Sequence, residues 1–167
     1  GGVLELASVK AFTEEQLKPY FPMPQVLDAM FNLCTRLFGI TIKSSEYPKI
    51  PTWHEDVRFY NVFDENDEMI AHFFLDPYSR PSEKRGGAWM NTCRNRRITD
   101  GKLVRPVVYV ICNGTPPIGS EPSLMNFYEV NTLYHEFGHA LQGMLTTVDE
   151  ADAAGVSGIE WDAVELA

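Results

Sequence analysis

Two stretches of the chain carry apolar residues at every third or fourth position, a period that predicts amphipathic helices. The first stretch covers residues 25–38 and is followed by Gly39, a residue type that commonly ends a helix. The second covers residues 123–146, and Ser123 is a favoured residue type at the start of a helix. A shorter helix is predicted over residues 13–20, where acidic residues follow a threonine.

Between the predicted helices, apolar and polar residues alternate in short runs, as they do in half-buried β-strands. Residues 57–63 and 69–75 are two such runs with a polar turn between them, which predicts a β-hairpin. Further strands are predicted over residues 40–42, 87–90 and 105–112. The order of helix, small sheet and long helix predicts an α+β fold, with helices flanking a small, mainly antiparallel sheet.

The second long helix contains the pentad His135-Glu136-Phe137-Gly138-His139. Two histidines four residues apart differ by about 40° around an α-helix, so both imidazoles leave the same side. Both can then bind one zinc ion, while the adjacent Glu136 reaches the attacking water without binding the metal itself. The alternative is a pentad that arose by chance on an amphipathic helix, with both histidines merely packed. The helical context and the acidic residues downstream favour a zinc site on this helix.

Catalytic zinc usually has three protein ligands, so a third must come from another part of the chain. One known extension of the pentad needs glycine at position 142 and histidine at position 145, where this chain has Gln142 and Leu145. No histidine follows His139, so the third ligand is expected to be a carboxylate. Spacing leaves six candidates open: Asp149, Glu150, Asp152, Glu160, Asp162 and Glu165.

Two of these acids, Asp162 and Glu165, are three residues apart in a predicted further helix and therefore share a face. Such a pair suggests one metal ligand and one group that orients an imidazole through a hydrogen bond. The alternative is that both acids face solvent near the start of that helix, where negative charge is favourable.

Five blocks of the sequence resemble, in the same order, the thimet-oligopeptidase-like family of zinc metallopeptidases and, within it, the oligopeptidase A branch. They are Asp-Pro-Tyr-Ser-Arg at 76–80, Gly-Gly-Ala-Trp-Met at 86–90, Cys-Asn-Gly-Thr-Pro-Pro at 112–117, His-Glu-Phe-Gly-His-Ala-Leu-Gln at 135–142 and Trp-Asp-Ala-Val-Glu-Leu at 161–166. Together these blocks span most of residues 13–167, so the resemblance is far more specific than the pentad alone.

The resemblance implies that His135, His139 and Glu165 bind one zinc ion (Zn2+) per chain and that Glu136 is the catalytic base. Relatives often have glutamate at position 131, one turn before the first histidine. Asn131 is on the same helix face, so its side chain is expected to orient the site through a hydrogen bond.

The resemblance also implies that the chain is part of a larger, mostly helical metallopeptidase catalytic domain. Residues 13–38 are expected to be helical, residues 40–112 to form the small sheet region, and residues 123–167 to form the zinc-site helices. The family usually continues with Pro-Ser-Gln after position 166, where this chain has Ala167. We therefore expect a fragment that lacks the rest of the catalytic domain as a packing partner.

The small residues Gly86, Gly87 and Ala88 suggest where a substrate binds. An exposed edge strand can bind an extended peptide through main-chain hydrogen bonds, and small side chains let the two backbones approach closely. We expect Gly87 and Ala88 to contact the substrate beside the zinc ion. The alternative is a glycine bulge near a turn.

Composition narrows the choice of partners and compartment. The net charge of −9 argues against nucleic acid and anionic membranes, because phosphate groups would be repelled. No run of eighteen apolar residues is present, and three widely spaced cysteines suit a reducing compartment. We expect an intracellular protein of the cytoplasm or of an organelle lumen or stroma.

The function predicted from these observations is zinc-dependent hydrolysis of peptide bonds in short peptides, with Glu136 activating the water. The family uses further residues beyond the third ligand, so residues 1–167 alone are expected to have very weak peptidase activity or none. The alternative function is that of a zinc-binding but catalytically inert fragment or truncated paralogue.

Overall fold

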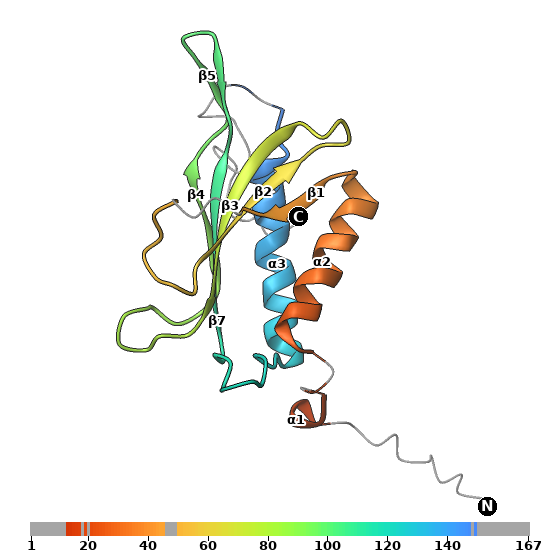
Figure 1. The fold of residues 1–167 in the computed structure, drawn as a ribbon, viewed down its shortest axis with the longest axis vertical. Helices are drawn as coiled ribbons and strands as arrows, with labels where there is room; N and C mark the ends of the chain where they lie inside the picture. The colour runs from red at the N-terminus through yellow and green to blue at the C-terminus, as the bar shows by residue number, and fades with distance from the viewer. Residues whose placement is uncertain (1–12, 18, 20, 46–49, 148, 150–167) are drawn as a thin grey trace, which may run out of the picture.

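A five-stranded sheet forms the centre of the structure, and two long helices pack against one of its faces (Figure 1). The computed structural model describes residues 13–17, 19, 21–45, 50–147 and 149. The elements follow one another in the order α1 (Glu14–Leu17), α2 (Met23–Phe38), β1 (Thr41–Ser44), β2 (Arg58–Phe63), β3 (Met69–Tyr78), β4 (Trp89–Arg94), β5 (Arg97–Thr99), β6 (Lys102–Val104), β7 (Val107–Gly114) and α3 (Phe127–Met144).

The strand order in the main sheet is β1-β2-β3-β7-β4, with β4 at one edge. The β3–β7 pair is parallel, and the other three pairs are antiparallel. The predicted α+β arrangement is confirmed, but the sheet is mixed because β3 and β7 pair in parallel across a long connection. That connection also contains β5 and β6, a two-stranded hairpin that projects past the end of the sheet (Figure 1).

The predicted hairpin of residues 57–63 and 69–75 is confirmed as the antiparallel pair β2–β3. Its turn is stabilised by Asp64, whose carboxylate accepts hydrogen bonds from the backbone N–H groups of Asn66 and Glu68, both at 2.9 Å. Such an Asp-centred turn is a local interaction, which explains why a polar cluster in the sequence was enough to place it.

Both ends of α2 are explained by backbone geometry. The helix begins two residues before the predicted start, and a proline at position 24 fits its first turn because a backbone N–H is not needed there. Gly39 ends the helix at φ 69°, and its N–H donates to the carbonyl of Thr35 at 3.0 Å. Of the predicted helix over residues 13–20, the structure describes the four residues of α1, while residues 18 and 20 lie outside the described residues.

The start of α3 was predicted wrongly at Ser123, because the true N-cap is Asn126. The Asn126 side chain accepts a hydrogen bond from the Glu129 N–H at 2.8 Å, and the Glu129 carboxylate accepts one from the Asn126 N–H at 3.2 Å. This reciprocal capping box satisfies two N–H groups that would otherwise lack a helical partner. Ser123 is instead buried, and its carbonyl accepts from the N–H of Met23 at the start of α2.

The core lies between the sheet and the two long helices. Alternate residues of β3, such as Phe73, face the helices together with alternate residues of β7. Phe137 of α3 is 2% exposed, and its ring centroid lies 5.3 Å from that of Phe73 and 6.0 Å from that of Phe31 on α2. This aromatic contact joins α2, α3 and the sheet in one cluster.

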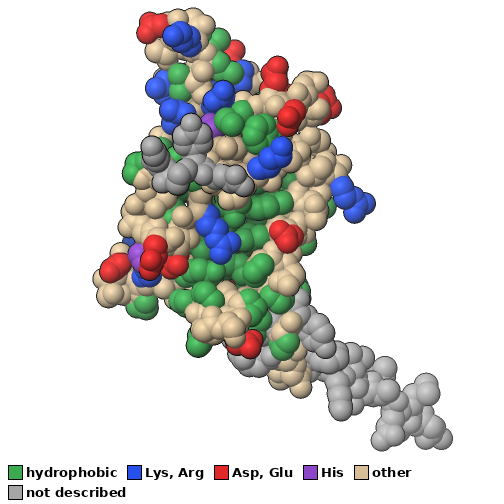
Figure 2. Space-filling view, viewed as in Figure 1, with side chains coloured by type: hydrophobic (Ala, Val, Ile, Leu, Met, Phe, Trp, Pro, Cys, Tyr) green, Lys and Arg blue, Asp and Glu red, His purple; other side chains and the backbone are tan. Residues whose placement is uncertain are grey.

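The opposite face of the sheet carries a second aromatic cluster. The Trp53 ring lies 5.4 Å from Phe74 and 5.5 Å from Tyr109, while Phe59 stacks on His72 at 5.4 Å. Figure 2 shows one face of the molecule, on which hydrophobic side chains gather near the middle and most charged side chains lie around them. Within the described ranges, no helix has the length and apolar character needed to cross a membrane.

The position of Phe137 at the junction of α2, α3 and the sheet generates a stability prediction. Phe137→Ala is expected to lower the free energy of unfolding by about 3–5 kcal/mol, because the lost contacts leave a cavity. Phe127→Ala on the same helix is the matched control: this ring is 60% exposed, and its removal should change stability by less than about 0.5 kcal/mol. Urea unfolding followed by circular dichroism measures both, and equal losses would contradict the proposed core.

Candidate metal centre

Two histidine side chains converge on one side of α3. The Nε2 atoms of His135 and His139 lie 3.0 Å apart, and the two rings are almost perpendicular, at 87°. His135 is exposed to solvent, whereas His139 is only 5% exposed. The spacing of one helical turn therefore does bring the two nitrogens together.

This spacing fits two ligands of a single metal ion. Imidazole nitrogens bind zinc at about 2.0–2.1 Å, so two of them in a tetrahedral site are about 3.3 Å apart. The observed 3.0 Å is close to that separation. Among the residues that the structure describes, no group of three or more histidine, cysteine or acidic side chains could hold a metal ion. Glu165 and Asp162 lie outside the described residues.

One of the six acids considered as the third ligand is described, and it has a different partner. The Asp149 carboxylate accepts a hydrogen bond from Nε of Arg96 at 2.8 Å, forming an ion pair beside the β5–β6 hairpin. Asp149 is therefore not brought together with the two histidines. The remaining candidates lie outside the described residues.

The carboxylate predicted to be the base lies on the same helix. Glu136 is half-buried on α3, between the two histidines in the sequence. The thiol of Cys112 on β7 is buried, and its pKa is raised to about 12. Burial is the main cause of this rise, and the negative charge of Glu136 contributes to it. Asn131, predicted to orient the site, is exposed one turn before His135.

The segment predicted to bind substrate leads into the edge strand. The predicted strand 87–90 was placed too early, because β4 starts at Trp89. Gly87 has φ 87°, a left-handed conformation that only glycine adopts easily, and it therefore precedes the strand. α3 packs across β7 and β4, so the edge strand and the histidine helix are neighbours (Figure 1).

A side chain of β7 holds this segment in place. The amide nitrogen of Asn113 donates hydrogen bonds to the backbone carbonyls of Arg85, at 3.1 Å, and of Gly87. Since both acceptors are backbone atoms, the contact fixes the path of the chain rather than a particular side chain.

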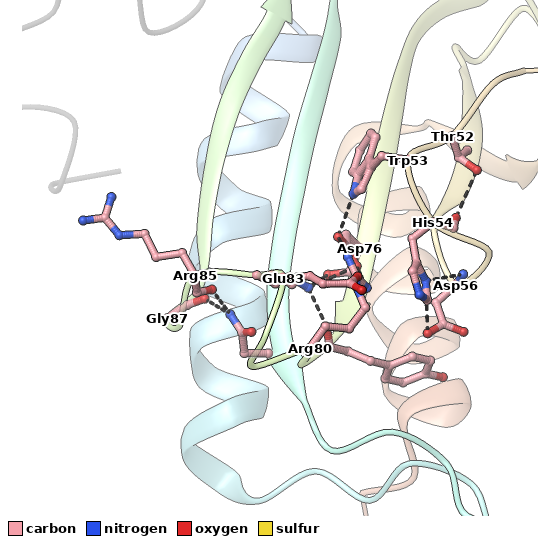
Figure 3. Close-up of polar contacts among 12 residues, drawn as sticks. Thr52, Trp53, His54, Asp56, Asp76, Arg80, Glu83, Arg85 and Gly87 are labelled. Atoms are coloured by element: carbon pink, nitrogen blue, oxygen red, sulfur yellow. Dashed lines mark hydrogen bonds and ion pairs between the residues drawn. The ribbon is translucent and has the colours of Figure 1, made fainter.

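The other end of the same loop is held by a buried carboxylate (Figure 3). Asp76, only 1% exposed at the end of β3, accepts two hydrogen bonds from Arg80 at 2.9 and 2.7 Å and one from Trp53 at 2.9 Å. The ammonium of Lys84 lies 3.0 Å from the same carboxylate and also donates to the carbonyls of Asp76 and Tyr78. The loop between β3 and β4 is thus bound to the sheet at both ends.

Charge pairing decides the ionisation of this network. Burial alone would raise the pKa of Asp76, but hydrogen bonds from Arg80, Trp53 and Lys84 outweigh it, so the pKa lies below its ordinary value. Burial lowers the pKa of Lys84, and the contact with Asp76 partly offsets this. A buried carboxylate with four donors is stable as an anion.

Sequence reasoning did not assign a role to Asp76, Lys84 or Asn113. Their partners lie up to 28 residues away in the sequence, as for Asn113 and Arg85. Two signals were available: Asp76 and Asn113 lie in blocks that carry the family resemblance, and Asp76 and Arg80 are four residues apart like a helical ion pair, although they lie outside any helix.

A His-Glu-x-x-His helix that packs beside the edge strand of a sheet is an arrangement typical of metallopeptidases. The chain belongs to peptidase family M3, whose sequence profile matches residues 4–167. The resemblance found in the sequence is thereby confirmed.

Several curated relatives of this chain are named oligopeptidase A. It is 55% identical to the organellar oligopeptidase A (chloroplastic/mitochondrial) of Arabidopsis thaliana, over 92% of this chain and 20% of that protein. It is 54% identical to the probable cytosolic oligopeptidase A of the same plant, over 92% of this chain and 22% of that protein. It is 46% identical to oligopeptidase A of Escherichia coli, over 93% of this chain and 23% of that protein. The chain thus spans about a fifth of the length of these relatives.

The Asp76 network generates a prediction about stability and pH. Asp76→Asn should lower the free energy of unfolding at pH 7 by about 3–5 kcal/mol, because it leaves buried cations without their anion. The folded-state pKa of Asp76 is depressed, so the stabilisation is fully present above its ordinary value of 3.8 and is lost as pH falls through the folded-state pKa. The difference between wild type and variant should therefore shrink in acid.

Urea unfolding of both proteins between pH 7 and pH 2.5 measures this difference. Asp28→Asn, which changes an exposed carboxylate on α2, serves as the control and should leave stability nearly unchanged. A constant difference at every pH would mean that the charge of Asp76 does not stabilise the fold.

Proposed function

We propose that this chain carries the zinc-binding and catalytic residues of an endopeptidase that hydrolyses short peptides. The observation that carries the proposal is the convergence of His135 and His139, with Nε2 atoms 3.0 Å apart, on the helix that also bears Glu136. Membership in peptidase family M3 supports it.

Three side chains would hold the metal in this proposal: His135, His139 and Glu165. Asp162 and Asn131 would orient the imidazoles through hydrogen bonds. When bound, zinc supplies a Lewis acid that polarises the scissile carbonyl and makes water a stronger nucleophile near neutral pH.

Glu136 would act as the general base and then as the general acid. Its carboxylate accepts a proton from the attacking water and afterwards donates that proton to the leaving amine nitrogen. A half-buried position suits both roles, because the group is shielded from bulk water yet reachable by substrate. The water oxygen would bond to the carbonyl carbon, the C–N bond would break, and two shorter peptides would be released.

The peptide would bind in an extended form along the edge of the sheet. β4 has β7 on one side and no strand on the other among the residues that the structure describes. Gly87 and Ala88 lead into this edge and would contact the peptide backbone. Main-chain hydrogen bonds would give affinity without a strict requirement for sequence.

Substrates and compartment are inferred from relatives. Proteins named oligopeptidase A from plant organelles, from the plant cytosol and from bacteria support short peptides as substrates and an intracellular location. The competing function is a zinc-binding chain without catalysis.

Metal binding tests the ligand set. Purified protein is expected to hold one equivalent of zinc by atomic emission analysis. Loss of a residue that merely supports a ligand costs about 10–100-fold in metal affinity, so His135→Ala, His139→Ala and Glu165→Ala should each weaken binding by more than about 100-fold. His54→Ala, whose ring contacts Asp56 in the loop before β2, should keep full zinc content. Unchanged zinc in Glu165→Ala would remove Glu165 from the site.

Hydrolysis tests the base and separates the two functions. Glu136→Gln should keep its zinc but reduce cleavage of a quenched fluorescent peptide by about 10²–10⁴-fold relative to the wild-type rate, however low that rate is. Glu68→Gln, an exposed change in the β2–β3 turn, should have the wild-type rate. Bound zinc together with no cleavage that depends on Glu136 would establish the inert alternative.

A further inference from the structure

The side chain of Asn113 joins β7 to the segment that leads into β4. Its amide nitrogen donates hydrogen bonds to the carbonyls of Arg85, at 3.1 Å, and of Gly87, and dashed lines in Figure 3 mark both. In the antiparallel β4–β7 pair, the first residue of β4, Trp89, is opposite Ile111. The same register, extended by two residues, places Gly87 opposite Asn113. The side-chain amide therefore acts where the backbone pairing of β4 has not yet begun.

The conformation of Gly87 explains why the backbone pairing does not extend this far. Its φ of 87° is outside the extended region that a paired strand needs. A backbone carbonyl that leaves the ladder needs another donor, because an unpaired one costs free energy. The two hydrogen bonds of Asn113 supply such donors and keep the chain against β7 beyond the last backbone pair.

Packing does little to hold the glycines of this segment. A Cβ added at Gly86 or at Gly87 would have no atom within 4 Å. One residue upstream of Arg85, the ammonium of Lys84 donates to the carbonyl of Tyr78 at 2.7 Å. The path of the chain between Lys84 and β4 therefore depends on hydrogen bonds rather than on side-chain contacts. The open space beside the glycines also lets another backbone approach them.

This end of β7 is close to the proposed base. Cys112, the residue before Asn113, is 7% exposed. Burial, with a smaller contribution from the negative charge of Glu136, raises the pKa of the Cys112 thiol to about 12. Glu136 is thus within electrostatic reach of β7 next to Asn113. Because α3 packs against both β7 and β4, the segment that Asn113 holds is a neighbour of the helix that bears the base.

We propose that Asn113 is a positioning residue, which fixes the segment leading into β4 and thereby sets which bond of a peptide paired with that edge lies beside Glu136. This inference rests on the proposed peptidase function. Asn113 acts through the backbone of its two partners, Arg85 and Gly87, and takes no part in the chemistry. A displacement of about 1 Å caused far from the reacting atoms can cost about 10²-fold in rate, so two such hydrogen bonds are enough to matter.

Backbone order parameters of the metal-free chain, measured by NMR relaxation, test whether Asn113 holds the segment. Asn113→Asp keeps the side-chain shape but replaces the N–H donors by a carboxylate, which the carbonyls of Arg85 and Gly87 repel. The order parameters of Gly86, Gly87 and Ala88 are expected to fall from about 0.85 in the wild type to below about 0.6. Unchanged order parameters in this variant would overturn the proposal.

A control and a change of pH separate this effect from a general defect of folding. Asn32→Asp makes the same change at an exposed position of α2 and should leave residues 86–88 as ordered as in the wild type. In Asn113→Asp, protonation of the introduced carboxyl group restores one O–H donor. The order parameters should therefore recover in part between about pH 8 and pH 4. The absence of recovery in acid would contradict the role given to these hydrogen bonds.

Product analysis of the zinc-loaded protein by mass spectrometry tests the effect on a peptide. The probe is a quenched nonapeptide that the wild type cuts mainly at one bond. Asn113→Asp should keep its zinc, lower kcat/KM at that bond about tenfold or more, and raise the share of cuts at neighbouring bonds at least threefold. Asn32→Asp should keep the wild-type rate and products.

The outcomes distinguish the positioning role from the peptidase function. Cleavage by Asn113→Asp at the same single bond and at the wild-type rate would refute the positioning role and leave the peptidase function intact. The expected loss of order without any cleavage that depends on Glu136 in the wild type would refute the peptidase function, and the positioning of a peptide with it.

Discussion

The packing of Phe137 against the sheet fixes the rotation of α3, and every other feature of the candidate site depends on that rotation. Phe137 is buried between Phe73 and Phe31. Residues two positions before and after it lie about 160° away around the helix, so His135 and His139 share one side of α3, away from Phe137. Around the helix axis, Glu136 lies about 100° from Phe137, between the direction of Phe137 and that of the two histidines.

The sheet contributes a second constraint through its two faces. The face toward the helices is apolar, and Gly143 lets α3 approach it closely, since a Cβ there would lie 3.4 Å from a methyl group of Val108. The other face carries aromatic rings and the charged network around Asp76. The loop between β3 and β4 connects these regions, because Asp76 holds its start and Asn113 holds its end.

Local patterns in the sequence were sufficient for the long helices and for the β2–β3 hairpin, because periodicity and a polar turn are properties of neighbouring residues. The pentad was recognisable for the same reason, and the structure brings its two histidine nitrogens together. The start of α3 was misplaced because Ser123 and Asn126 are both good N-caps, and only the reciprocal bond with Glu129 distinguishes them. The pattern also gave no sign of the β5–β6 hairpin, whose apolar residues Ile98 and Leu103 are exposed.

Features made by distant residues could not be predicted in this way. The parallel pairing of β3 and β7 and the hydrogen bonds of Asn113 both join segments that are far apart in the sequence. Gly87 shows how such contacts bear on the site. Its left-handed backbone conformation, and the hydrogen bond that its carbonyl accepts from the side-chain amide of Asn113, set the direction in which the chain enters β4. A peptide paired with that edge would run along the same direction. Asn113, although it lies on β7 rather than on the histidine helix, would therefore help to determine which peptide bond reaches Glu136.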